Sequence, residues 1–149
     1  SSDLFGVLER ELVAADARTG DVQNISPSLI NTYGADPRTI EHRWTWITPL
    51  TISPSPPHAL YVGAQLLFKS NDRGQHWQII SPDLTGKTRT ADQCQGKVAV
   101  ADARECGFGA IFTIAPSPHD AAEVWVGTDS GLVQRTRDGG KSWQNLTPN

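Results

Sequence analysis

Short apolar runs separated by turn residues dominate the pattern of hydrophobic and polar positions along this chain. Four such runs, rich in β-branched and aromatic residues and bounded by proline, glycine, asparagine or aspartate, cover residues 50–53, 60–63, 66–70 and 77–80. This composition and these boundaries are typical of short β-strands. Since no segment shows a sustained helical period, the sequence predicts an all-β chain.

The strand pattern belongs to an internal repeat. Four segments return in the same order: ISPSP at 52–56 as IAPSP at 114–118, YVG at 61–63 as WVG at 125–127, SNDRGQHW at 70–77 as TRDGGKSW at 136–143, and ISPD at 80–83 as LTPN at 146–149. Residues 12–27 form a partial third copy, whose turn lacks the aspartate and tryptophan positions. The offset grows along the unit, which indicates small loop insertions between loosely constrained copies.

A unit of four antiparallel strands that repeats in this way is typical of a β-propeller blade. A β-sandwich is the alternative, but its strands need not repeat one turn chemistry at one place. The sequence therefore predicts β-propeller blades, about two and a half of them. They divide the chain into the second half of a blade with strands three and four (1–28), an inter-blade loop (29–46), a complete blade (47–83), an inserted loop (84–108) and a second complete blade (109–149).

The two repeated turns carry residues that stabilise a hairpin. In the first turn, the Asp72 carboxylate can accept backbone N–H groups, Gly74 can take a positive φ and Trp77 can bury its indole. The residues with these roles in the two turns are Ser70, Asp72, Gly74 and Trp77, and Thr136, Asp138, Gly140 and Trp143. A calcium site would need several more oxygen ligands nearby. We therefore expect both turns to be structural elements.

Both turns match Ser/Thr-x-Asp-x-Gly-x-x-Trp and so resemble the Asp-box of BNR-repeat propellers, which occur in sialidases, xyloglucanases and sortilin-type receptors. The wider frame, with Trp44–Thr45–Trp46 before one blade and Gly131–Leu132–Val133 before the second turn, is similar to large secreted bacterial proteins with sortilin-like BNR propellers. The resemblance implies that the box lies on the rim of the propeller, away from the central pocket, and serves folding.

Composition and charge narrow the classes of partner. The 149 residues carry 13 basic and 16 acidic side chains, a net charge of −3, so no field favours nucleic acid or an anionic membrane. No apolar run approaches the roughly 20 residues that span a bilayer, and residues 1–10 have neither a basic start nor an apolar core. We expect no nucleic-acid or membrane partner, and the resemblance to secreted proteins implies a secreted or periplasmic location.

The cysteines and histidines suggest a disulfide and no metal. Cys94 and Cys106 lie in one polar stretch and can close a loop in an oxidising compartment. The four histidines show no short spacing between any two of them: His42, His58, His76 and His119. The sequence therefore predicts a Cys94–Cys106 disulfide, no metal site and no cofactor.

Two long connections are candidate binding loops. Residues 29–46 and 84–108 far exceed the roughly 4–6 residues typical of connections in compact domains. In a propeller, the connection between blades lies on the face where the central channel opens. The first connection ends in four candidate ligand-binding residues, His42, Arg43, Trp44 and Trp46. The alternative is that the two indoles fill the core between blades and that the guanidinium caps a carbonyl.

No catalytic set is identifiable in the sequence. A glycosidase needs two carboxylates that flank the scissile bond, and nothing separates Asp36, Glu41, Asp102 and Glu105 from solvated charges. Nucleophile-elbow, phosphate-loop and metalloprotease motifs are missing as well.

The sequence therefore predicts a propeller segment that acts as a non-catalytic scaffold for a glycan, peptide or protein. Its structural partners would be the remaining blades of a longer chain. The alternatives are part of a sialidase- or xyloglucanase-like glycoside hydrolase whose catalytic residues lie partly outside this chain, and a ring closed by further copies of this chain.

Overall fold

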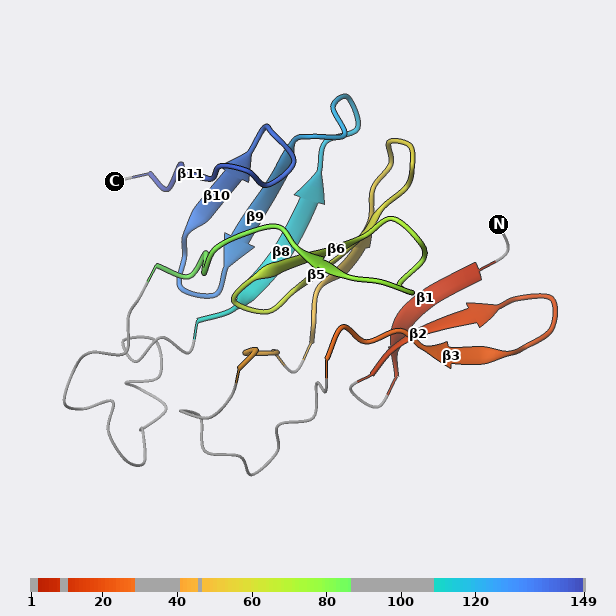
Figure 1. Cartoon of the computed structure of the whole chain (residues 1–149). Helices are drawn as coiled ribbons and strands as arrows, with labels where there is room; N and C mark the ends of the chain where they lie inside the picture. The colour runs from red at the N-terminus through yellow and green to blue at the C-terminus, as the bar shows by residue number, and fades with distance from the viewer. Residues whose placement is uncertain (1–2, 9–10, 29–40, 46, 87–108, 149) are drawn as a thin grey trace, which may run out of the picture.

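A computed structural model describes residues 3–8, 11–28, 41–45, 47–86 and 109–148 (Figure 1). Within these ranges the secondary structure is entirely β, as the sequence predicts. The strands are β1 (Asp3–Leu8), β2 (Glu11–Asp16), β3 (Val22–Asn24), β4 (Leu50–Ile52), β5 (Leu60–Gly63), β6 (Leu67–Ser70), β7 (Gln78–Ile79), β8 (Ile111–Pro116), β9 (Val124–Thr128), β10 (Val133–Thr136) and β11 (Gln144–Asn145).

These strands form three antiparallel sheets. The first sheet has the order β1-β2-β3, the second β4-β5-β6-β7 and the third β8-β9-β10-β11. The second sheet contains the four strands that the sequence predicts. The first sheet contains one strand more than the two expected from the sequence, because β1 pairs with β2 along its whole length, from Asp3 opposite Asp16 to Leu8 opposite Glu11.

The sheets lie side by side (Figure 1). Apolar side chains fill both spaces between them. Because the second sheet is covered on both faces, all four residues of β5 are buried and its strand pattern loses the usual alternation. The packing between the second and third sheets is close at Gly63. A Cβ there would lie 2.6 Å from Cγ2 of Ile111, so only glycine fits this position.

Each sheet closes with the same two hydrogen bonds, which makes the three sheets repeats of one unit. The N–H of an aliphatic residue donates to a carbonyl thirteen positions earlier: Ile25 to Leu12 at 2.8 Å, Ile80 to Leu67 at 2.9 Å and Leu146 to Val133 at 2.8 Å. The hydroxyl that follows accepts the N–H of that earlier residue: Ser26 from Leu12, Ser81 from Leu67 and Thr147 from Val133.

Candidate functional site

The turn at residues 70–77 is a closed hydrogen-bond network. The Ser70 hydroxyl donates to Asp72 Oδ1 at 2.8 Å and accepts the N–H of Gly74 at 2.8 Å. The backbone N–H of His76 donates to Asp72 Oδ1 at 2.9 Å, and the ring atom Nδ1 of His76 lies 2.6 Å from Asp72 Oδ2. These bonds from His76 and Ser70 lower the pKa of the Asp72 carboxyl from 3.8 to about 2.

The turn at residues 136–143 repeats this network with two exchanges. Thr136 takes the place of the first serine: its hydroxyl donates to Asp138 Oδ1 at 2.8 Å and accepts the N–H of Gly140 at 2.9 Å. Ser142 takes the place of the histidine and donates its hydroxyl and its N–H to the same carboxylate at 2.6 and 2.9 Å. The pKa of Asp138 is accordingly lowered to about 2, mainly by the Ser142 hydroxyl.

Both turns join neighbouring sheets through their tryptophans. The indole N–H of Trp77 donates to the carbonyl of Ile25 at 2.7 Å, and that of Trp143 donates to the carbonyl of Ile80 at 2.9 Å. The acceptors occupy the same position in the first and second sheets. A Cβ on Gly140 would collide with the Ile80 carbonyl oxygen, so the second turn needs glycine at this contact. These side chains therefore serve the packing of the sheets.

Arg43 joins the loop before β4 to the second and third sheets. Its Nη2 donates to Asp83 Oδ2 at 2.7 Å and to the Thr85 hydroxyl at 3.1 Å, and its Nε donates to the Gly109 carbonyl at 3.0 Å. Its backbone N–H donates to Gln65 Oε1 at 2.7 Å. The side chain is only 10% exposed. This arrangement favours the structural alternative for Arg43, because three donors are engaged within the chain.

Trp44 and His42 pack on Phe68 of β6. The ring centroids of Trp44 and Phe68 lie 5.4 Å apart, and those of His42 and Phe68 lie 5.1 Å apart. Trp44 thereby adds to the core between the first and second sheets, as the core alternative expects. Trp46, the fourth candidate, lies outside the described residues. A ligand-binding role for these four residues therefore stays a prediction.

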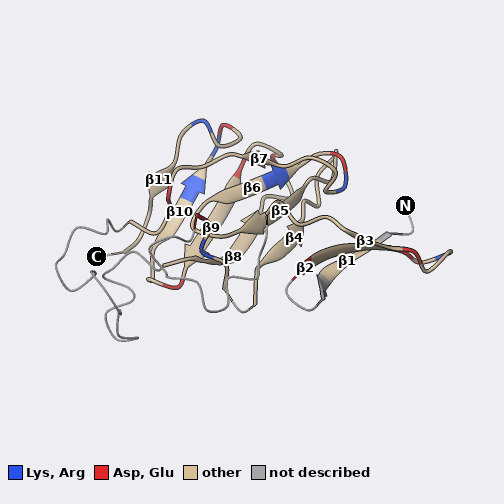
Figure 2. Ribbon diagram, turned by 60° about the horizontal axis from the view of Figure 1, so that its bottom comes forward, with Lys and Arg blue, Asp and Glu red and all other residues tan. Residues whose placement is uncertain are grey.

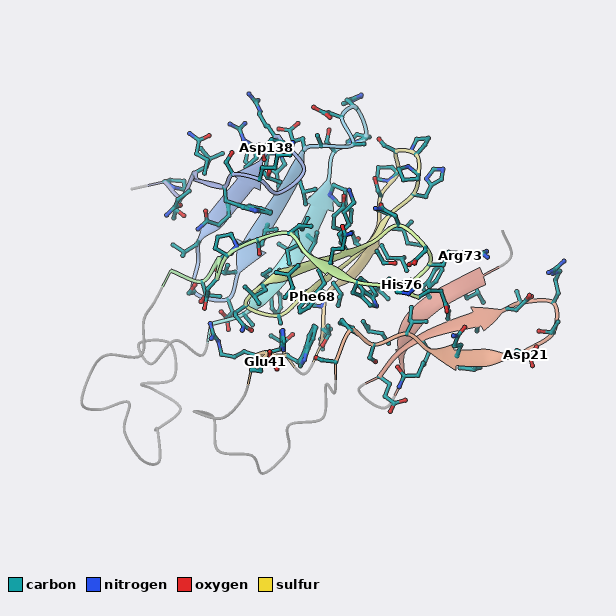
Figure 3. All side chains as sticks on the ribbon, viewed as in Figure 1. Asp21, Glu41, Phe68, Arg73, His76 and Asp138 are labelled. Atoms are coloured by element: carbon teal, nitrogen blue, oxygen red, sulfur yellow. The ribbon has the colours of Figure 1, made fainter. Side chains whose placement is uncertain are left out.

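A groove that the sequence does not predict opens between the first and second sheets. Its volume is about 610 Å³, within the range of small-ligand sites. Apolar side chains of β1, β4 and β5 form part of its wall, and the turn at residues 70–77 adds polar groups: Phe5, Ile52, Pro57, His58, Leu60, Asn71, Asp72 and Arg73. Figure 3 shows Arg73 at the end of this turn that faces β1.

Two other predictions concern metals and cysteines. In the part of the chain that the structure describes, no group of three or more His, Cys, Asp or Glu side chains is placed to hold a metal ion. Cys94 and Cys106 lie outside the described residues, so the disulfide stays a prediction.

No helix in the described ranges is long and apolar enough to cross a membrane. Acidic and basic residues are interspersed, mainly on the turns (Figure 2).

No protein-family model matches the chain, and no curated protein matches it. Solved structures match its fold. It aligns over 97% of its length with YCF48 bound to D1 peptide, with 14% identity and a TM-score of 0.51, and covers 36% of that chain. It aligns over 99% of its length with the GH74 enzyme of Niastella koreensis, with 12% identity and a TM-score of 0.53, and covers 21% of that chain. YCF48 from Cyanidioschyzon merolae gives a TM-score of 0.44, with 16% identity over 74% of this chain and 29% of that one.

The first two structures are β-propellers, so the comparison confirms the propeller fold that the repeat predicts. The chain spans only about a fifth to a third of the length of these proteins.

Proposed function

We propose that this chain is a segment of a propeller that acts as a non-catalytic scaffold and binds a peptide or protein partner, with a glycan as the other ligand class. The observation that carries the proposal is the groove between the first two sheets, where apolar walls meet a polar rim. Ligand sites commonly combine these two features. The structure of YCF48 with a bound peptide supports the peptide among these ligands, since it shares the fold.

In this proposal the two repeated turns are Asp-boxes of the BNR type, and the chain works in a secreted or periplasmic protein. The networks around Asp72 and Asp138 support the first point, since both carboxylates are bound within their own turns. The Cys94–Cys106 pair supports the second, because a disulfide persists in an oxidising compartment. Alkylation of the native protein followed by mass spectrometry tests this pair: free thiols would contradict it.

The structural partners in this proposal are further blades, of a longer chain or of further copies. The second and third sheets carry an aromatic residue at the same position of the repeat. Tyr61 is 1% exposed beneath the third sheet, and Trp125 occupies the corresponding register position, opposite Arg135. A further blade would cover Trp125 as the third sheet covers Tyr61.

The alternative function is part of a glycoside hydrolase, which the shared fold of the GH74 enzyme supports. A general acid at neutral pH needs a raised pKa. Asp72 and Asp138 have the opposite shift. These two carboxylates are therefore poor acids for glycoside cleavage, and an enzyme would need others.

The experiment that separates the two functions uses the full chain. A peptide library and a glycan array are screened for binding, and the same glycans are incubated with the protein and analysed for released sugars. The proposal expects saturable binding without release of product. Cleavage of a glycan would contradict the non-catalytic scaffold and favour the hydrolase. A screen without any bound peptide or glycan would contradict the binding function.

A further inference from the structure

One cross-strand pair distinguishes the first sheet from the other two. In each sheet an aromatic residue lies directly opposite a residue of the next strand, and the three pairs are Phe5 and Ala14, Tyr61 and Lys69, and Trp125 and Arg135. Side chains at opposite positions of an antiparallel pair lie on one face of the sheet. Phe5 and Ala14 both pack on the core between the first and second sheets, so this face of the first sheet is turned toward the second.

In the second and third sheets this pair places a cation over an aromatic ring. Nζ of Lys69 lies 5.7 Å from the centre of the Tyr61 ring, and the guanidinium carbon of Arg135 lies 4.9 Å from the centre of the Trp125 ring. At both distances a cation is attracted to the face of the ring. The side chain of Ala14 ends at its Cβ, so β2 brings no cation to the Phe5 ring.

A pocket opens over Ala14, at the register position that carries a long basic side chain in the other two sheets. Its volume is about 270 Å³, and its wall includes residues of the first sheet and of the turn at residues 70–77: Ala14, Asp16, Asp21, Gln23, Asp72 and Arg73. Asp72 and Arg73 also line the groove, so this aspartate pocket adjoins the groove. Since Arg73 is part of the wall, the volume is space that remains beside its side chain.

The wall of the aspartate pocket carries an excess of negative charge. The aspartates are Asp16, Asp21 and Asp72, and the wall includes one arginine, Arg73. Arg18 pairs with Asp16 at 3.3 Å, but its side chain is 77% exposed and does not line the pocket. Opposite charges attract each other more strongly in a partly buried site than in bulk water. The pocket therefore favours a cation.

We propose that the groove and the aspartate pocket together bind a peptide in which a lysine or arginine stands next to an apolar residue. The basic side chain enters the aspartate pocket and lies beside the Phe5 ring, as Lys69 lies over the Tyr61 ring in the second sheet. The apolar residue packs on the groove wall at Ile52 and Leu60. This inference rests on the proposed function, in which a peptide is the ligand, and it names the side chains that the ligand needs.

The first test compares the sequences of the peptides that bind in the library screen. Fluorescence anisotropy then measures the affinity of the full chain for the tightest dye-labelled peptide and for two copies with glutamine or glutamate in place of its basic residue. We expect lysine or arginine beside an apolar residue in the bound peptides. Glutamine should weaken binding about tenfold, and glutamate should weaken it further. Bound peptides without a basic residue, or a glutamine peptide that binds as tightly as its parent, would overturn the proposal.

Ala14→Lys supplies the cation from the chain itself. The new side chain stands at the register position of Lys69, fills the pocket and reduces its negative charge, so it should weaken binding of the basic peptide about tenfold or more. Val22→Lys is the matched control, because Val22 lies in the same sheet, is 59% exposed and lines neither the pocket nor the groove. It should leave binding unchanged. Circular dichroism confirms that both variants fold, and equal effects of the two substitutions would overturn the proposal.

A second pair of variants tests the charge of the pocket if Ala14→Lys does not fold. Asp21 lies on the exposed hairpin between β2 and β3 (Figure 3), and Asp120 is an exposed aspartate outside the pocket wall. Asp21→Asn should weaken binding of the basic peptide about fivefold and leave the glutamine peptide unaffected. Asp120→Asn should change neither. Unchanged binding of the basic peptide by the Asp21→Asn variant would overturn the proposal.

Two outcomes distinguish this inference from the function on which it rests. A peptide or glycan that binds without a basic group would overturn the inference, while the scaffold function would stand. If no peptide or glycan binds, the proposed function and this inference both fail.

Discussion

Replacement of Trp143 measures how strongly a repeated turn holds two sheets together. Its indole is partly buried against the core between the second and third sheets and donates to the Ile80 carbonyl at 2.9 Å. Trp143→Phe keeps an aromatic ring but removes the N–H, which leaves that carbonyl without this donor and costs about 1 kcal/mol. Trp143→Ala also leaves a cavity where the ring was, and should lower the free energy of unfolding by about 3 kcal/mol. This value is the lower end of the range for buried tryptophans, because the Trp143 side chain keeps some exposure.

Urea unfolding followed by far-UV circular dichroism gives the free energy of unfolding of the three proteins. The expected order of stability is parent, then phenylalanine, then alanine, with similar urea dependence. Trp77 offers an internal comparison, because its indole makes the same bond to Ile25 at 2.7 Å. Phenylalanine and alanine variants as stable as the parent would refute the reasoning that these turns join the sheets.

Three other predictions follow from the contacts. The folded-state pKa values of Asp72 and Asp138 are about 2, below the ordinary 3.8. Their contribution to stability is therefore present above about pH 4 and is lost as the pH falls through 2. Thermal unfolding from pH 6 to 2 should show this loss, and the double variant with asparagine at both positions should show a flatter dependence of melting temperature on pH. Gly140→Ala should destabilise more than Gly139→Ala, since both have positive φ but only Gly140 meets a neighbour within 4 Å; equal melting temperatures would contradict this. Arg43→Met should lower the unfolding free energy by about 2 kcal/mol, because it removes the side-chain hydrogen bonds to Asp83, Thr85 and Gly109. Retained stability with weaker ligand binding would assign Arg43 to the site.

The strands of the second and third sheets are predictable because each is a short β-branched or aromatic run between turn residues. β1 is missed, since Gly6 interrupts its apolar run and its repeat partners differ in sequence. The repeat also misleads at one place, because aligning the sequences of its two copies places Ile52 opposite Ile114. The register instead equates Leu50 with Ile114, because these two residues pair with the same position of the next strand.

The site was less predictable than the fold. The hydrogen bonds around Asp72 and Asp138 join residues within four positions of each other, so the sequence anticipates them. The turn tryptophans instead bond to carbonyls 52 and 63 positions away, which the sequence does not announce. Arg43 takes its partners from positions far along the chain, such as Asp83 and Gly109, and no local pattern announces them. The groove likewise brings Phe5 beside Ile52, and both look like ordinary strand residues until the sheets are placed in space.

The hydrogen bond that joins the first two sheets and the groove in which we propose a ligand lie in different parts of their junction. Trp77 and Ile25 form the hydrogen bond between the two sheets, and neither lines the groove. Asp72 belongs to both, but its oxygens are engaged by Ser70 and His76, and its low pKa keeps it charged through neutral pH. Substitution at Ile52 can therefore change binding while the turn stays intact. A hydrogen bond between the sheets that lies apart from the groove thus leaves the groove open for the proposed ligand.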